Sequence, residues 1–346
     1  MPQKIDITPE ERQITELERR IAGTNAENKD LRKSLTRARE ETESLREKFD
    51  DLLALRRPIK TGPIVRPCSA SYHGVALAEW SDWHVAEKIE ARKVNGLNRF
   101  SPEIATKRAH HCAYSTHALY CHVRKSYGVD SMVLVLGGDF ITGYLHEELV
   151  ATNYMGPVEE GIFAQKLLAE CLSIVADEKS LKKLRVICHR GNHGRTTKKM
   201  QFKNDFSTSY ETWIYANLMD KFADSNRIVF EIPESDVHYT EVFPAWNLRT
   251  FHGHQVKYSD GIGGLTIPLN KWEAKQDATT PAQYNLMGHY HFYSEPNGKT
   301  TLNGSLKGYD EYAASHGFPF QPPLQSFNLL DVGRRMIAQR MPIFCE

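Results

Sequence analysis

The sequence has few of the features that mark a secreted or membrane-spanning protein. Its 346 residues include six cysteines but no Cys-x-x-Cys pair, which argues for reduced thiols rather than disulfides or a zinc knuckle. No apolar run approaches the roughly 20 residues of a membrane helix. The N-terminus lacks the apolar core of a signal peptide. We therefore expect a cytoplasmic protein with no membrane partner.

The chain also lacks an excess of either charge. Lysine and arginine number 44 and aspartate and glutamate 43, which gives a net charge of +1. A binding site for a polyanion such as nucleic acid must therefore be a local patch. The residues are 40% apolar, 25% charged and 10% aromatic. This composition is typical of a soluble globular protein and excludes a collagen-like or wholly disordered chain.

A seven-residue apolar repeat runs through the first 52 positions. Residues 10–51 include 12 acidic and 10 basic residues and no proline. The seam positions are Ile14, Leu17, Ile21, Thr24, Asn28, Leu31, Leu35, Ala38, Thr42, Leu45, Phe49 and Leu52. So long a helix cannot bury its stripe on one compact domain. The repeat therefore predicts a coiled coil that makes the chain a homo-oligomer, with Asn28 fixing the register. A solvated single helix, or one folded back on its own body, is the alternative.

Prolines then divide the chain. Pro58, Pro63 and Pro67 cannot continue a helix, so we expect a coiled-coil helix over 1–57 and a globular domain over 58–346. In the globular part, short apolar runs alternate with helical stretches, and strands and turns predominate toward the C-terminus. The helical stretches lie near residues 102–127, 157–177 and 208–223. This order predicts an α/β body on a mixed, buried sheet.

Five short motifs each follow an apolar run, where an α/β sheet places its ligands. They are Asp82-Trp83-His84, Gly137-Gly138-Asp139, Gly191-Asn192-His193, His252-Gly253-His254 and Gly288-His289-Tyr290-His291. In an extended segment, residues i and i+2 point the same way, so Asp82 with His84 can direct two ligand atoms into one cleft. Imidazoles and carboxylates together suit Mn²⁺, Fe or Zn²⁺. Each motif alone is ordinary turn chemistry, but the five together predict a metal site.

In this order, the motifs resemble those of the calcineurin-like metallophosphoesterase superfamily over about residues 73–305. The resemblance implies the α/β fold of that family, a metallophosphoesterase sandwich of two packed mixed β-sheets flanked by helices. It also implies two divalent metal ions, for which we expect Mn²⁺ first and Fe, Zn²⁺ or Ni²⁺ as alternatives. The first ion would be held by Asp82, His84 and His291, the second by Asn192, His252 and His289, and Asp139 would bridge both.

The resemblance further implies that His193 contacts the scissile phosphate and protonates the leaving oxygen. Two cations would lower the pKa of a water enough to supply hydroxide as the nucleophile. His254 is either a donor behind the ligands or solvated, since the family places its ligand at the first histidine of such a pair.

Two positions depart from the family pattern. Gly194 stands where many members carry an acidic residue, so another group must orient His193. The second motif lacks an acidic residue that many members have four positions in. His146, Glu147 and Glu148 follow it, either as groups that support the ligands or as an exposed helix start.

A basic segment surrounds His193. Residues 182–203 contain eight basic residues and no acidic one: Lys182, Lys183, Arg185, Arg190, Arg195, Lys198, Lys199 and Lys203. Arg190 and Arg195 are candidates for clamping a phosphodiester, and the lysines for following a longer DNA or RNA backbone. The alternative is a solvated loop balanced by acids elsewhere. Aromatic residues near the motifs are candidates for base stacking or for the cleft wall: Trp83, Tyr144, Tyr154, Tyr290, Phe292 and Tyr293.

Three functions remain open at this point. The first is a nuclease similar to the metallophosphoesterase subunit of bacterial double-strand-break repair complexes, which the basic segment and the coiled coil favour. The second is a phosphatase or cyclic-nucleotide phosphodiesterase for small molecules, which the neutral total charge favours. The third is a scaffold with a vestigial metal site, and the full ligand set argues against it. Residues 150–154 and 304–313 also resemble uncharacterised bacteriophage metallophosphoesterases, which implies no substrate; a viral protein would act in the host cytoplasm.

Overall fold

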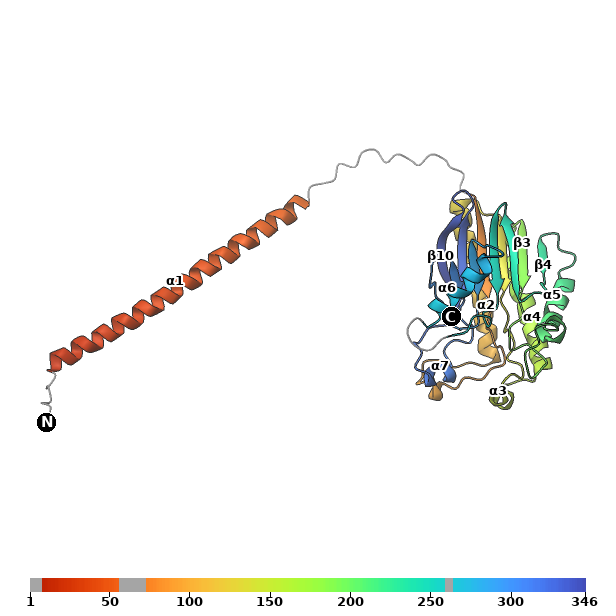
Figure 1. Cartoon of the computed structure of the whole chain (residues 1–346), viewed down its shortest axis with the longest axis horizontal. Coiled ribbons are helices and arrows are strands. Elements are labelled where there is room, and N and C mark those ends of the chain that lie inside the picture. Colours follow the sequence, from red (N-terminus) through yellow and green to blue (C-terminus); the bar gives the residue numbers. More distant parts are fainter. Residues whose placement is uncertain (1–7, 56–72, 259–263) are drawn as a thin grey trace. The chain divides into compact units, whose positions relative to one another are not determined.

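The computed structural model describes residues 8–55, 73–258 and 264–346. The chain divides into two units, residues 1–68 and residues 69–346. We describe each by itself and call the second the globular unit (Figure 1). The boundary expected at 57/58 lies outside the described residues. No helix in the described ranges is both long and apolar enough to cross a membrane.

The described part of the first unit, residues 8–55, contains one helix, α1 (Pro9–Leu55), which is 47 residues long. The helix begins with a capping box: the Thr8 N–H donates to Glu11 Oε2 (2.9 Å), and the Glu11 N–H donates to Thr8 Oγ1 (3.4 Å). Pro9 at the first helical position suits this start. The long N-terminal helix is thus confirmed. Its seam is uncovered in the single chain, since Ile21 is 60% and Leu31 66% exposed.

The globular unit contains two mixed β-sheets. The first has the order β10-β9-β1-β2-β3-β4, and β10 and β4 form its two edges (Figure 1). Its strands are β1 (Gly74–Trp80), β2 (Ser131–Leu136), β3 (Lys183–Cys188), β4 (Ile228–Glu231), β9 (Leu324–Asp331) and β10 (Met336–Phe344). Strands β1 to β4 are parallel, whereas β9 pairs antiparallel with β1 and with β10.

The second sheet has the order β5-β6-β7-β8. Its strands are β5 (Val237–Phe243), β6 (Trp246–Phe251), β7 (Tyr284–Met287) and β8 (Thr300–Leu302). Only β5 runs antiparallel to its neighbour. The helices are α2 (Pro102–Tyr127), α3 (Glu147–Thr152), α4 (Pro157–Ala176), α5 (Tyr210–Lys221), α6 (Thr266–Asp277) and α7 (Glu311–Ser315). The three expected helical stretches are confirmed as α2, α4 and α5, while α6 was not anticipated in the C-terminal half.

Alternating strand residues build the layers, because successive side chains of a strand point to opposite faces. In β1, Val75 and Leu77 pack between the sheets, against residues of the second sheet such as Leu286. Ala76 and Trp80 belong instead to the core shared with α2, α4 and α5. The outer face of the second sheet packs against α6. The expected fold class, two packed mixed sheets flanked by helices, is confirmed.

Candidate metal centre

The pairing of the strands brings the five motifs together at the carboxyl ends of the strands. We call this end of the two sheets the motif edge. The last residues of the first three strands are register partners, Trp80 with Leu136 and Leu136 with Cys188. In the second sheet, Phe251 and Met287 are partners in the same way. The two sheets are joined at this edge, since His252 Nδ1 lies 2.8 Å from the carbonyl oxygen of Gly137. All five turns therefore begin side by side.

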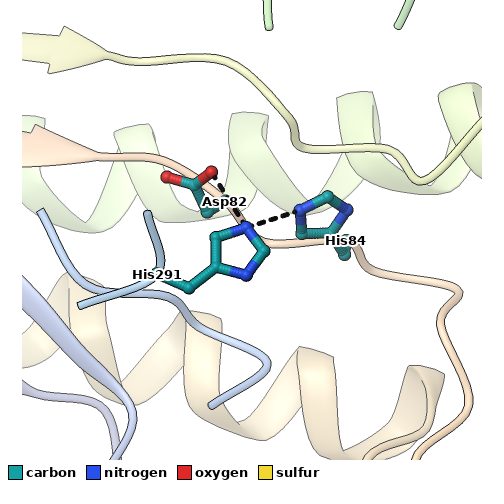
Figure 2. A group of neighbouring side chains, drawn as sticks. All are labelled: Asp82, His84 and His291. Atoms are coloured by element: carbon teal, nitrogen blue, oxygen red, sulfur yellow. Dashed lines mark hydrogen bonds and ion pairs between the residues drawn. The ribbon is translucent and has the colours of Figure 1, made fainter. Parts of the chain in front are cut away.

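The first cluster contains Asp82, His84 and His291, and Figure 2 shows His291 between the other two. His291 Nε2 lies 3.3 Å from Asp82 Oδ1 and 3.2 Å from His84 Nε2. The other oxygen of Asp82 already accepts from Ser81 Oγ (2.5 Å) and from the His289 N–H (3.0 Å). One carboxylate oxygen and two imidazole nitrogens thus converge, and these are ligand atoms that Zn²⁺, Fe and Mn²⁺ accept.

The second cluster contains Asp139, His252 and His289, with Asn192 beside them. His252 Nε2 lies 3.0 Å from Asp139 Oδ2 and 3.2 Å from Asn192 Oδ1. Because Nδ1 donates to Gly137, a neutral His252 presents a lone pair at Nε2 to two oxygen acceptors. Either a proton or a cation has to lie between such atoms. The donor set therefore fits a metal ion.

Asp139 lies between the two clusters. It forms one group with His252 and His289 and another with His84 and His193, and the ligand atoms within each group lie within 4.8 Å of one another. Asp139 Oδ1 accepts from the His193 N–H (2.8 Å), whereas Oδ2 faces His252 Nε2 at 3.0 Å. This position suits the bridging role that the family resemblance implies.

The protonation states suit metal binding. Burial lowers the pKa of His289 to about 3 and holds that of His84 well below its usual range, so both imidazoles are neutral. The histidines hold the pKa of Asp139 well below its usual range despite burial, so it is charged. Against the lowering effect of burial, Asp139 raises the pKa of His252 to about 10. A bound cation would replace that proton, because a ligating imidazole must be neutral.

Unusual backbone conformations concentrate in this site. Eight non-glycine residues among those described have positive φ: Asp82, His84, Asn95, Asp139, Ala245, His289, His291 and Arg335. Five of the eight are proposed ligands. Asp and His tolerate the left-handed region better than most residues, and such conformations persist where the surrounding structure imposes them. The segment with Asp82 and His84 is therefore not extended, as the sequence analysis expected; both residues lie in a left-handed turn that directs their side chains.

Glycine lets two of the turns approach each other. A Cβ on Gly191 would lie 1.9 Å from Asp139 Oδ1, and a Cβ on Gly138 would lie 2.2 Å from the Gly191 nitrogen. Neither contact is sterically possible. The glycines that precede Asp139 and Asn192 are therefore required for the two ligands to meet.

His193 is oriented by a backbone group rather than by a neighbouring acid. Its Nδ1 lies 2.9 Å from the carbonyl oxygen of Thr142, so the Nδ1–H donates there and Nε2 is left free. Burial lowers the pKa of His193 to about 4. The acidic residue missing at position 194 has no space, since a Cβ on Gly194 would lie 2.8 Å from Glu211 Cγ.

Two buried glutamates that the sequence analysis missed hold these turns. Glu211 of α5 accepts from the N–H of Phe140 (2.8 Å) and of Gly191 (2.6 Å). Glu160 of α4 accepts from the N–H of Thr142 (2.7 Å) and also from the N–H groups of Gly143 and Ala86. Burial raises the pKa of Glu160 to about 7 and, together with Asp139, that of Glu211 to about 8. Neither glutamate lies in a motif. The one signal in the sequence is an acidic residue on the apolar face of each helix.

The two arginines lie in different surroundings. Arg190 is 5% exposed and donates to Asp205 Oδ2 (2.7 Å) and to the carbonyl oxygens of Pro233 (2.6 Å) and Glu234 (3.0 Å). Its guanidinium is therefore occupied, and the structure does not bring it to the clusters. Arg195 is half-buried and donates to the carbonyl oxygens of Asn192 and Thr197. It stays a candidate for contact with phosphate.

Strand β3 divides the basic segment. Lys182 pairs with Asp130 and Arg185 with Glu231, before or within the strand and away from the motif edge. On the motif side, the exposed basic residues are Lys198, Lys199 and Lys203. The local positive patch near His193 is thus smaller than the sequence count suggests.

The remaining candidates lie around the clusters. His254 packs beside His252, with ring centroids 5.6 Å apart, and belongs to none of the described ligand groups. The His146 ring lies 5.7 Å from that of His193, whereas Glu147 and Glu148 are exposed in the first turn of α3. Of the aromatic candidates, Trp83 is fully buried in the core, while Tyr144 (58% exposed) and Tyr154 (52% exposed) are accessible, as are the partly exposed Tyr290, Phe292 and Tyr293.

Comparisons with known proteins give weak similarities to solved structures. No family model matches the chain, and no curated protein matches it. Among solved structures, the sulfate thiohydrolase SoxB of Thermus thermophilus in complex with glycerol is 11% identical, with a TM-score of 0.31 over 78% of this chain. The chain spans 56% of the length of that protein. A phosphatase from Mycoplasma pneumoniae is 11% identical, with a TM-score of 0.28 over 78% of this chain and 93% of its own. Both similarities are too low to indicate a function, so the family resemblance stays a prediction from the motifs.

We expect Asp139→Asn to lower the content of bound divalent metal more than any other single substitution in the site, because Asp139 lies within ligand reach of His84 in the first cluster and belongs to the second. Metal per chain is measured by elemental analysis after dialysis against Mn²⁺. The control is Glu148→Gln, because Glu148 is exposed and lies outside both clusters. This variant should bind as much metal as the wild type. Unchanged metal content in Asp139→Asn would refute the shared role.

We expect Glu211→Ala to loosen the turns around Asp139 and Gly191. The change leaves two buried N–H groups without acceptors, each at a cost of about 1–3 kcal/mol. Urea unfolding should show this loss, and titration with Mn²⁺ should show weaker binding. Glu170→Ala, an exposed glutamate that pairs with His110, is the matched control. A variant with wild-type stability and metal affinity would show that Glu211 does not support the site.

Proposed function

We propose that the protein is a dinuclear metal-dependent phosphoesterase that hydrolyses phosphodiester bonds of DNA or RNA. The observation that carries the proposal is the convergence of seven ligand side chains on one sheet edge, with Asp139 in reach of both clusters. Asp82, His84, Asp139 and His252 are buried, whereas Asn192, His193, His289 and His291 are half-buried. A substrate would therefore approach from the side of the second set.

The first ion would be held by Asp82, His84 and His291, the second by Asn192, His252 and His289, and Asp139 would serve both. When bound, divalent cations such as Mn²⁺ offset the charge of a phosphoryl group and lower the pKa of an attacking water. The chain itself supplies rigid, neutral imidazoles and charged carboxylates.

His193 would serve the leaving group. Its Nδ1–H is bonded to Thr142, so Nε2 is the nitrogen free to exchange a proton with substrate. The lowered pKa makes the ring neutral near pH 7, and the negative charge of a bound phosphate would raise that pKa. The ring can then take up a proton when substrate binds and deliver it to the departing oxygen. Arg195, held beside Asn192, would contact a non-bridging phosphate oxygen.

We expect His193→Ala to retain metal but to slow cleavage by about 10²- to 10⁴-fold, the usual contribution of a general acid. The loss should be smaller for bis-p-nitrophenyl phosphate than for a dinucleotide, because p-nitrophenolate departs without a proton and a sugar alkoxide does not. Both rates are measured with Mn²⁺ at one pH. An equal loss on the two substrates would instead mean that His193 binds phosphate in the ground state.

The exposed segment after His193 supports a nucleic-acid substrate. Lys198, Lys199 and Lys203 are exposed there, and Phe202 between them is 80% exposed. Basic side chains that follow a backbone, with an aromatic ring beside them, are typical of sites for single-stranded nucleic acid. Tyr144 is a second accessible ring close to His193, since it follows Gly143, which packs on the His193 carbonyl.

We expect the affinity for DNA or RNA to fall steeply with salt, because binding to phosphates releases counterions. Replacing Lys198 and Lys199 by Ala should lower the log–log slope by about one to two units, roughly one per phosphate contact. Fluorescence anisotropy over a salt series measures it. Lys182→Ala, at the far end of β3, is the control that should keep the slope. If DNA and RNA bound with an affinity that does not depend on salt, or did not bind, the proposed nuclease function would be contradicted.

The second candidate is a phosphatase or cyclic-nucleotide phosphodiesterase for small molecules. The pairing of Lys182, Arg185 and Arg190 with acidic partners favours it, because it reduces the positive field around the site. A substrate panel with Mn²⁺ distinguishes the two: this candidate predicts turnover of p-nitrophenyl phosphate or cyclic nucleotides and none of nucleic acid. No turnover at all would point to the vestigial scaffold.

We also propose that α1 pairs with a second copy of the chain. Replacing Leu31 and Leu35 by Glu should halve the mass seen by light scattering, because seam positions carrying like charges oppose pairing. Cleavage of bis-p-nitrophenyl phosphate should be unchanged, whereas processing of long nucleic acid should weaken as two linked sites become separate. Ala26→Glu with Lys33→Glu, on the face opposite the seam, is the control. A monomeric wild type would contradict the coiled coil.

A further inference from the structure

A second group of metal-ligating side chains lies outside the candidate metal centre. His117 and Cys121 are one turn apart on α2, and Glu178 follows the end of α4. Their Nε2, Sγ and Oε2 atoms lie within 4.8 Å of one another, and all three residues are half-buried. None of them has a part in the function proposed above.

The topology separates this group from the metal centre. The motifs follow the C-terminal ends of β1, β2 and β3. Cys121 lies in the last two turns of α2, which leads to the N-terminal end of β2, and Glu178 precedes the N-terminal end of β3. Because β2 and β3 are parallel, their N-terminal ends lie together on the side of the sheet opposite to their C-terminal ends. The group therefore cannot share an ion with Asp139.

The three distances match one face of a tetrahedron. Cys121 Sγ lies 3.5 Å from His117 Nε2 and 3.3 Å from Glu178 Oε2, and His117 Nε2 lies 3.4 Å from Glu178 Oε2. Zinc ligand distances of about 2.0–2.3 Å give tetrahedral edges of about 3.3–3.7 Å. All three edges fall in or at this range.

A neighbouring residue orients the carboxylate. Glu178 Oε1 accepts from the Ser180 N–H (2.9 Å) and from Ser180 Oγ (2.6 Å), so only Oε2 faces the histidine and the cysteine. Partners of this kind behind a ligand are usual in metal sites. In the absence of a cation, His117 and Cys121 would both donate to this one oxygen.

We propose that His117, Cys121 and Glu178 bind one Zn²⁺ or a similar borderline divalent cation, with the fourth position open to water. Nitrogen, sulfur and oxygen ligands in tetrahedral geometry are those that Zn²⁺ prefers. Such an ion would join α2 to the turn between α4 and β3. It would stabilise this edge of the sheet, remote from the candidate metal centre.

Cobalt(II) tests the site directly, because only a sulfur ligand gives a thiolate-to-cobalt charge-transfer band and the metal centre at Asp139 contains no cysteine. The full chain is used with Cys68→Ser, so that this cysteine, which lies outside the described residues, cannot contribute to the band. Titration with Co²⁺ should produce a band whose final intensity corresponds to one thiolate-bound cobalt per chain, and Zn²⁺ should abolish it. The band should persist in Asp139→Asn, which separates this site from the proposed phosphoesterase.

Matched variants identify the ligands. Cys121→Ser should lose the band and His117→Gln should weaken it strongly, whereas His110→Gln on the same helix should keep it. Ser180→Ala should weaken Co²⁺ binding about 10- to 100-fold, the usual effect of removing a partner behind a ligand. Absence of the band in the parent chain, or its persistence in Cys121→Ser, would overturn the proposal.

Alkylation of the Cys68→Ser chain gives a second readout should Cys121→Ser fail to fold. Iodoacetamide should label the half-buried Cys121 faster than the buried Cys112, Cys171, Cys188 and Cys345. Zn²⁺ should slow labelling of Cys121 alone, as located by peptide mass spectrometry. Equal labelling of Cys121 with and without Zn²⁺ would mean that these three residues form only a hydrogen-bonded cluster.

Discussion

The compensation of one buried carboxylate is the constraint on which the candidate site depends. Asp139 is 1% exposed and lies where the two sheets meet. An uncompensated buried charge costs several kcal/mol, and here the His193 N–H and the His252 ring offset it. Both groups belong to turns that follow other strands than the one before Asp139. The charge of Asp139 is therefore offset only when these turns are in their folded positions. A cation bound at the same oxygen would stabilise the folded turns through this link.

Helix carboxylates fix these turns from behind. Glu160 and Glu211 together accept five backbone N–H groups of the turns that carry His84, Asp139 and His193. Loops in unusual backbone conformations need such external support. The helices therefore do more than cover the sheet: they determine where the ligand-bearing turns lie. The same logic explains why position 194 is glycine, since Glu211 occupies the space that a side chain would need.

The sequence predicts this architecture well where short-range rules apply. The heptad repeat predicts the long helix, and the motifs after apolar runs predict ligands at strand ends. It does not predict the surroundings of single side chains in the site, because these depend on contacts between residues far apart in the chain. Arg190 and Arg195 look alike in the sequence, yet Asp205 and two distant carbonyls bind only the first. Glu211, 72 positions beyond Asp139, reaches the site only because α5 packs beneath the turns. Likewise, nothing local shows that Thr142, rather than a neighbouring acid, orients His193.

The candidate metal centre as proposed has one carboxylate, Asp139, serving two metal ions where the two sheets meet. Anomalous diffraction from crystals grown with Mn²⁺ would locate these ions. We expect two peaks about 3.5–4 Å apart, both in contact with Asp139. One should lie near Asp82, His84 and His291 and the other near Asn192, His252 and His289. A single peak, or two peaks that do not share Asp139, would show that Asp139 does not serve two ions.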